Sequence, residues 1–68
     1  MTASDAKRIR SEAAAMTLDG LREAHRQQTS LWAEAMLRGN IEAAQYHHEA
    51  ACEYAEVYQR AAFPRKAA

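Results

Sequence analysis

The segment between Asn40 and Phe63 constrains the fold most, because it carries two heptad seams side by side. The first seam consists of Ala44, His48, Ala51, Ala55, Tyr58 and Ala62. The second seam consists of Ala43, His47, Ala50, Tyr54, Val57 and Ala61. Both advance by alternating steps of four and three residues, so one helix presents two adjacent apolar stripes where a surface helix normally presents one. Such a helix needs two neighbours, and a short chain has to borrow one of them from another molecule.

Length and composition narrow the class of protein. The 68 residues suffice for a single domain, 1–68, whose core is marginal without some further source of stability. Cys52 is the only cysteine, so disulfides cannot supply that stability, and a reducing compartment is indicated. No apolar run approaches the roughly 18 residues of a membrane span, and residues 1–5 lack the apolar stretch of a secretory signal. We therefore expect a cytoplasmic protein that does not enter a membrane.

Cap residues predict the first two helices. Ser4 or Thr2 can cap a short helix over about residues 5–16, in which apolar positions follow helical spacing. Thr17 is a typical N-cap for a second helix over about residues 18–38, and Asp19 places a carboxylate near its positive end. The Ala-rich composition, with two glycines and one proline, leaves little to build strands from.

The third helix is bounded by equally clear signals. Gly39 suits the left-handed conformation that ends a helix, and Asn40 can cap the next one directly. Pro64 disfavours helical geometry in the residue before it, which predicts a helix over about residues 41–62 and a flexible tail over 64–68. So tight a turn makes the two long helices antiparallel. The expected fold is all-α: a short N-terminal helix plus a long antiparallel helical hairpin, which completes a helical bundle by oligomerisation.

Residues 39–44, followed by Ala51, resemble the inter-helix turn of a tetratricopeptide repeat and the small residues on its second helix. Leu31 matches a preferred position on the first helix of that family. The sequence departs from the family at Trp32, where a small residue is usual, and at Ala35, where an aromatic one is usual. One repeat cannot form the stacked solenoid on which the family's peptide groove depends. The resemblance therefore implies a helical hairpin and no binding residues.

Pairing positions outward from the turn indicates which seam is free. The first seam falls opposite Leu31, Gln28 and Leu21 of the second helix. The second seam is then left for the first helix, a second subunit or a target protein, which makes its residues the interface candidates: Ala43, His47, Ala50, Tyr54, Val57 and Ala61. Leu37 lies on the polar side of the second helix and is a further contact candidate. A two-fold dimer that forms a four-helix bundle is the expected assembly.

Two polar residues interrupt the apolar arc of the second helix. His25 and Gln28 lie one turn apart there, and a buried polar group without a partner costs roughly 1 to 3 kcal/mol. Tyr54 and Tyr58 of the third helix are placed to satisfy them. We expect a polar layer that sets helix register or oligomeric state. The alternative is a small-ligand pocket at the same four residues.

Charged residues suggest two further surfaces, although nine basic and nine acidic side chains cancel. The acidic stripe consists of Glu42, Glu49 and Glu56, spaced by sevens, with Glu53 beside it. It is either the solvated back of a helix or a docking surface for a basic partner. The basic set consists of Lys7, Arg8, Arg10, Arg22 and Arg26. These side chains could bind phosphates, but no aromatic residues are interleaved among them, so a nucleic-acid surface is the weaker alternative.

Residues 48–52 come nearest to a chemical motif. They have the spacing of a zincin helix, with Cys52 in place of the second histidine. A zincin needs a third ligand and a cleft, so we interpret His48 as a seam residue and Cys52 as a small buried thiol. The sequence predicts no catalytic residue, no metal ligand and no cofactor.

These features favour a small non-enzymatic protein-protein interaction module. We expect an adaptor or inhibitor that binds itself, most simply as a homodimer, and a larger protein partner whose identity the sequence does not reveal. The size suits the accessory proteins that phages and mobile elements encode. The alternatives are a regulator that binds nucleic acid through the basic N-terminal face, and a small-ligand binder at the His25 layer.

Overall fold

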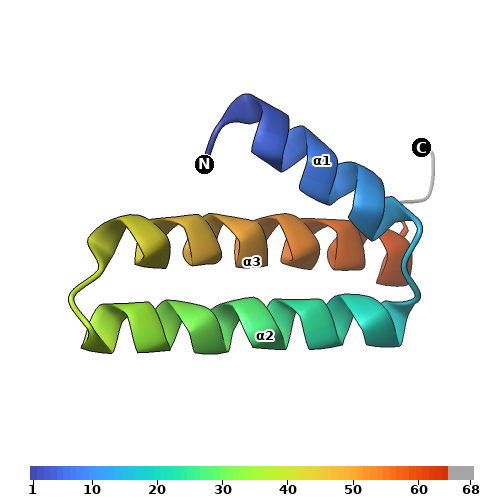
Figure 1. The fold of residues 1–68 in the computed structure, drawn as a ribbon. Coiled ribbons are helices and arrows are strands. Elements are labelled where there is room, and N and C mark those ends of the chain that lie inside the picture. Colours follow the sequence, from blue (N-terminus) through green and yellow to red (C-terminus); the bar gives the residue numbers. More distant parts are fainter. Residues whose placement is uncertain (65–68) are drawn as a thin grey trace.

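The computed structural model of the protein describes residues 1–64, and it is all-helical over that range (Figure 1). The helices are α1 (Ala3–Ala14), α2 (Leu18–Leu37) and α3 (Ile41–Ala62), with no strand among the described residues. Of the flexible tail expected over 64–68, residues 65–68 lie outside the described part. No helix within residues 1–64 combines the length and the apolar character needed to cross a membrane.

A capping box determines where α1 begins. The Thr2 hydroxyl accepts a hydrogen bond from the Asp5 amide at 3.1 Å, and the Asp5 carboxylate accepts one from the Thr2 amide at 3.3 Å. The helix therefore starts at Ala3, two residues before the expected position. It ends at Ala14 rather than near residue 16, because Thr17 is extended (φ −73°, ψ 164°) to cap α2 through the Gly20 amide.

The turn between α2 and α3 is a Schellman motif. Gly39 has the positive φ of 74° that the sequence predicts, and no other described residue has a positive φ. The Asn40 amide donates to the Ala35 carbonyl at 2.9 Å, and the Gly39 amide donates to the Met36 carbonyl at 3.1 Å. The Asn40 side chain then accepts from the Ala43 amide at 3.2 Å and caps α3. Gly39 thus ends α2 and Asn40 caps α3, so the chain reverses direction within two residues.

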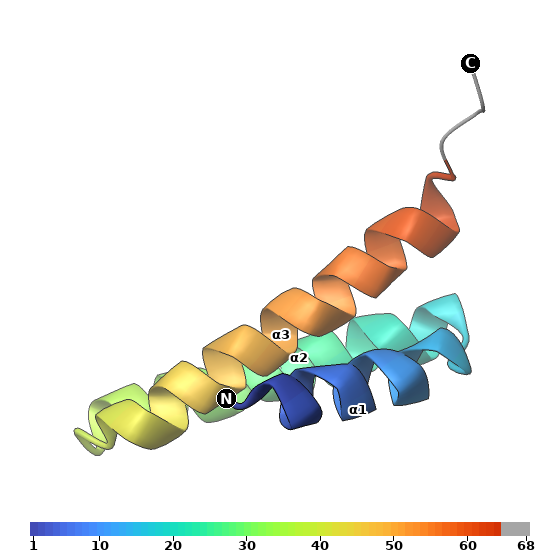
Figure 2. The ribbon, with the colours of Figure 1, turned by 90° about the horizontal axis from the view of Figure 1, so that it is seen from above.

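The two long helices, α2 and α3, lie side by side and run in opposite directions, and α1 lies against α3 from its middle toward the end away from the turn (Figure 1). Seen from above, α1 runs along one side of α3, and the opposite side carries no helix (Figure 2). The molecule measures 45 × 23 × 21 Å. Hence α3 is the central element, with α2 and α1 as its two neighbours.

The core is small and alanine-rich. Its main cluster joins α1 to both long helices and consists of Ile9, Ala13, Leu21, Ala50 and Tyr54. Five of the eight buried apolar residues in the described chain are alanines, and Leu21 is the one large side chain that is fully buried. Alanine lets helix axes approach closely but removes little apolar area from water. The close packing of the helices therefore comes with a modest hydrophobic stabilisation.

Candidate functional site

The second seam of α3 is occupied at its centre by α1. Ala50 and Tyr54 are buried in the cluster with Ile9 and Ala13, and Val57 packs against that cluster. Of the three occupants expected for this seam, the first helix takes its middle. The remaining seam candidates lie outside the α1 contact: Ala43 and His47 toward the turn, and Ala61, exposed, toward the C-terminal end of α3. The middle of this seam is therefore unavailable to another molecule while α1 is docked.

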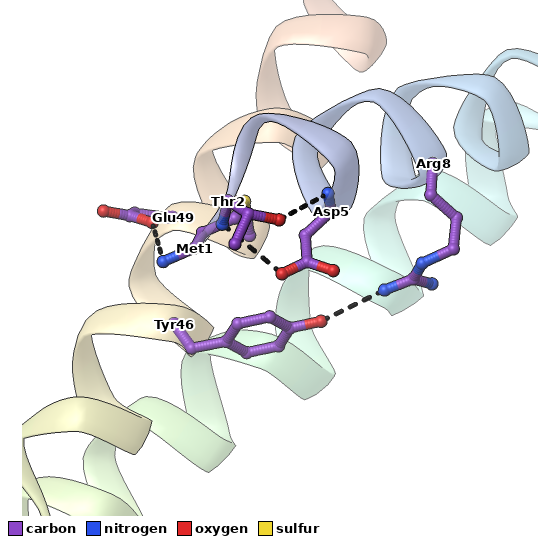
Figure 3. A network of polar contacts seen from close by, with 6 residues as sticks. All are labelled: Met1, Thr2, Asp5, Arg8, Tyr46 and Glu49. Atoms are coloured by element: carbon purple, nitrogen blue, oxygen red, sulfur yellow. Dashed lines mark hydrogen bonds and ion pairs between the residues drawn. The ribbon is translucent and has the colours of Figure 1, made fainter.

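The acidic and basic candidates meet each other inside the chain. Arg10 Nε lies 2.9 Å from Glu53 Oε2, and no hydrogen bond reaches that buried oxygen, so the ion pair is its electrostatic partner. The Met1 amine lies 3.1 Å from Glu49 Oε2 (Figure 3). Arg8 donates to the Tyr46 hydroxyl at 3.3 Å, which raises the pKa of the guanidinium. Glu49 and Glu53 of the acidic stripe thus contact residues of α1 and the segment before it.

Other charged candidates pair within their own helices. Arg26 donates to Glu23 at 2.9 Å, a contact that lowers the pKa of the Glu23 carboxyl and raises that of the guanidinium. Glu56 accepts from Arg60 at 3.0 Å on α3. The three remaining charged candidates are exposed: Lys7, Arg22 and Glu42. Arg8, Arg10 and Arg26 thus each contact a side chain of the same chain while they remain exposed themselves.

The expected polar layer has a different membership in the structure. Gln28 Oε1 lies 2.8 Å from His47 Nδ1, so this histidine, and neither tyrosine, is its partner. Tyr54 faces α1 in the core, and His25 is exposed at the edge of a recess that also contains Tyr58. The pairing across the turn already placed His47 one helical turn from Gln28. The register of the two helices is therefore compatible with a Gln28–His47 pair, but His47 was assigned to the second seam.

The histidine and thiol of the zincin-like segment adjoin without forming a metal site. His48 Nε2 lies 3.8 Å from Cys52 Sγ, and Cys52 is exposed rather than buried as expected. Within residues 1–64, no group of three or more His, Cys, Asp or Glu side chains is arranged to hold a metal ion. The His48 ring instead lies beside Trp32, with 6.4 Å between ring centroids.

Trp32 and His48 belong to an open groove between α2 and α3, on the side of α3 away from α1. The groove is lined by His25, Thr29, Trp32, His48, Ala51, Cys52 and Ala55. Helical spacing by fours and threes extends this lining along both helices. We call the resulting surface the groove face, and it comprises the groove lining together with Leu18, Arg22, Met36, Ile41 and Gln59.

The groove face carries large apolar side chains, and no helix of the described chain covers it. Leu18, Met36 and Ile41 are 41%, 48% and 62% exposed, and Trp32 is 38% exposed. Arg22, toward the end away from the turn, is its one Asp, Glu, Lys or Arg residue. Large exposed side chains grouped on one face are typical of a contact surface. In the sequence, His25, Thr29, His48 and Cys52 interrupt the apolar pattern along this face.

Comparison of the chain with protein-family models, curated proteins and solved structures finds no match.

Proposed function

We propose that this chain is a non-enzymatic protein-protein interaction module whose contact surface is the groove face. The observation that carries the proposal is a face with one charged residue at its end, on which Trp32, Met36 and Ile41 are exposed. Tryptophan and methionine are enriched at the centres of protein interfaces, where charged residues are depleted. A module of this kind acts by contact, as an adaptor or an inhibitor of a larger protein.

The alternative surfaces have less support. A regulator that binds nucleic acid needs free cations along one face. In this chain Arg8 and Arg10 are turned to α3, where they contact Tyr46 and Glu53. A ligand pocket at the His25 layer needs convergent polar groups, but Gln28 is already paired with His47. We therefore retain the protein-interaction function as the single proposal.

The test is affinity capture from the native cell with two variants of the full chain that differ by one position. Thr29→Glu places a carboxylate in the groove, and Ser30→Glu places the same carboxylate on the adjacent exposed position outside it. We expect Ser30→Glu to retain the proteins captured by the natural chain and Thr29→Glu to lose them. Equal capture by the two variants would place the contact surface elsewhere. Binding of a DNA or RNA probe that weakens steeply with salt would favour the regulator instead.

A further inference from the structure

We propose that the groove face binds the groove face of a second copy of this chain, around a two-fold axis that passes close to Cys52. The four long helices of the two copies then form a bundle, with each α1 on its outer side. This inference rests on the proposed function, because it names the partner of the same surface. It also moves self-association from the second seam, whose centre α1 occupies, to the opposite side of α3.

The small size of the core favours association of the chain with a second copy. Three buried large side chains, Ile9, Leu21 and Tyr54, and five buried alanines form a small core for a chain of this length. Chains of this size gain stability from disulfides, metals or oligomerisation. Cys52 is the sole cysteine, and the described residues hold no cluster of three metal-ligating side chains. A second copy of the chain would bury further apolar area, and no other molecule is needed for this.

The distribution of charge also favours contact between two copies of the groove face. In a two-fold contact every residue of the face meets the same face, so a charged surface would repel itself. The groove face has a single Asp, Glu, Lys or Arg residue, Arg22, whereas the opposite sides of both long helices carry several acidic and basic side chains. Arg22 lies toward one end of the face, and a two-fold axis through the middle keeps its two copies at opposite ends of the assembly. Self-contact therefore brings no like charges together.

The extent of the groove face and the place of Cys52 on it indicate where the two-fold axis lies. The groove face runs from Leu18 to Met36 on α2 and from Ile41 to Gln59 on α3, so it extends along most of both long helices. Overlap of two such faces is greatest when the axis passes through their middle. Cys52 lies near the middle of α3, on the groove, and is exposed. The two copies of Cys52 should therefore approach each other across the axis.

A cysteine-specific crosslink tests this arrangement. The full-length natural chain, treated with a short bis-maleimide under reducing conditions, should give a covalent dimer in high yield. Cys52→Ser combined with Thr29→Cys keeps one thiol in the middle of the groove and should also crosslink. Cys52→Ser combined with Ser30→Cys moves the thiol one position, off the face, and should remain a monomer on a denaturing gel. Equal yields from the two moved thiols would overturn the two-fold geometry.

Sedimentation equilibrium tests the association itself. The natural chain and Ser30→Glu should sediment as dimers of the 7.6 kDa chain. Thr29→Glu should raise the dimer dissociation constant by at least about 100-fold, because each dimer would bury two unpaired carboxylates. Circular dichroism should show unchanged helix content in both variants, since both positions are exposed.

A natural chain that stays monomeric up to on the order of 100 µM would overturn the dimer inference, since that concentration marks only weak binding. The proposed function would survive that result if Thr29→Glu still abolished capture of a different protein while Ser30→Glu did not. If the two variants also captured the same proteins, the proposed function would fail together with the dimer.

Discussion

Leu21 is the side chain on which the packing of this small core depends most. It is 1% exposed and contacts the cluster that joins all three helices. Because its neighbours are largely alanines, few atoms can move to refill the space that a truncation leaves. The cost of such a cavity comes in addition to the lost burial of the side chain itself.

We predict that Leu21→Ala lowers the free energy of unfolding by about 3 kcal/mol or more, within the range for buried leucines. Urea unfolding at a fixed protein concentration measures the change. Leu37→Ala is the matched control, because Leu37 is 89% exposed, and surface truncations usually change stability by less than about 0.5 kcal/mol. Similar losses from the two variants would contradict the packing described for Leu21.

The Asp5 carboxyl should make the stability of the protein depend on pH. Its hydrogen bonds with Thr2 hold the pKa of the carboxyl below its ordinary value of 3.8. A carboxyl whose pKa is lower in the folded state contributes stability that is present above 3.8 and is lost as the pH falls through the folded value. Asp5→Asn should therefore destabilise the protein at neutral pH, and its difference from the natural chain should disappear at strongly acidic pH. Thermal unfolding of both chains between pH 7 and pH 2 measures this, and a difference that is constant with pH would exclude the capping box as its cause.

The turn between α2 and α3 determines whether two helices form or one. Gly39 has a φ of 74°, and a Cβ added there would meet nothing within 4 Å. We predict that Gly39→Ala costs roughly 1 to 2 kcal/mol from backbone strain alone. Gly39→Asn should cost less, since asparagine tolerates this conformation better. Chemical denaturation of the three chains tests the order, and equal stabilities of the Ala and Asn variants would argue against backbone strain.

The docking of α1 rests on few contacts, chiefly Ile9 and Ala13 against Ala50 and Tyr54. We predict that Ile9→Ala, at a position that is 3% exposed, costs about 2 to 4 kcal/mol. If that loss releases α1 before the long helices separate, amide hydrogen exchange should accelerate in α1 while the middle of α3 stays protected. Ser11→Ala, at an exposed position of the same helix, is the control. Uniform acceleration in all three helices would show instead that the fold opens as a unit.

For the whole molecule, stability and association should be coupled. If the second copy supplies part of the apolar burial, the midpoint of thermal unfolding should rise with protein concentration, because association stabilises the folded state by mass action. Thr29→Glu should remove this concentration dependence, and Ser30→Glu should keep it. Differential scanning calorimetry over a hundredfold concentration range measures the effect. A midpoint of the natural chain that does not change with concentration would contradict the coupling.

The local features of this protein could be read from the sequence. Thr17, Gly39 and Asn40 are the caps that their residue types predict. Each acts through a hydrogen bond or a backbone conformation that involves residues at most five positions apart. Thr2, one of the two N-cap candidates for α1, forms the capping box with Asp5, and this local contact also explains why the helix starts at Ala3 rather than near residue 5.

The distribution of neighbours around α3 was decided only by the tertiary structure. The sequence leaves the second seam to three possible occupants and does not decide that α1 covers its middle, because the short link after Ala14 leaves the crossing direction of that helix open. The same docking pairs Arg10 with Glu53 and leaves the groove face bare. Local hydrogen bonds therefore determine where the helices begin and end, and the sequence alone indicates them. The free surface depends on contacts between residues far apart in the chain, and only the packed helices determine those.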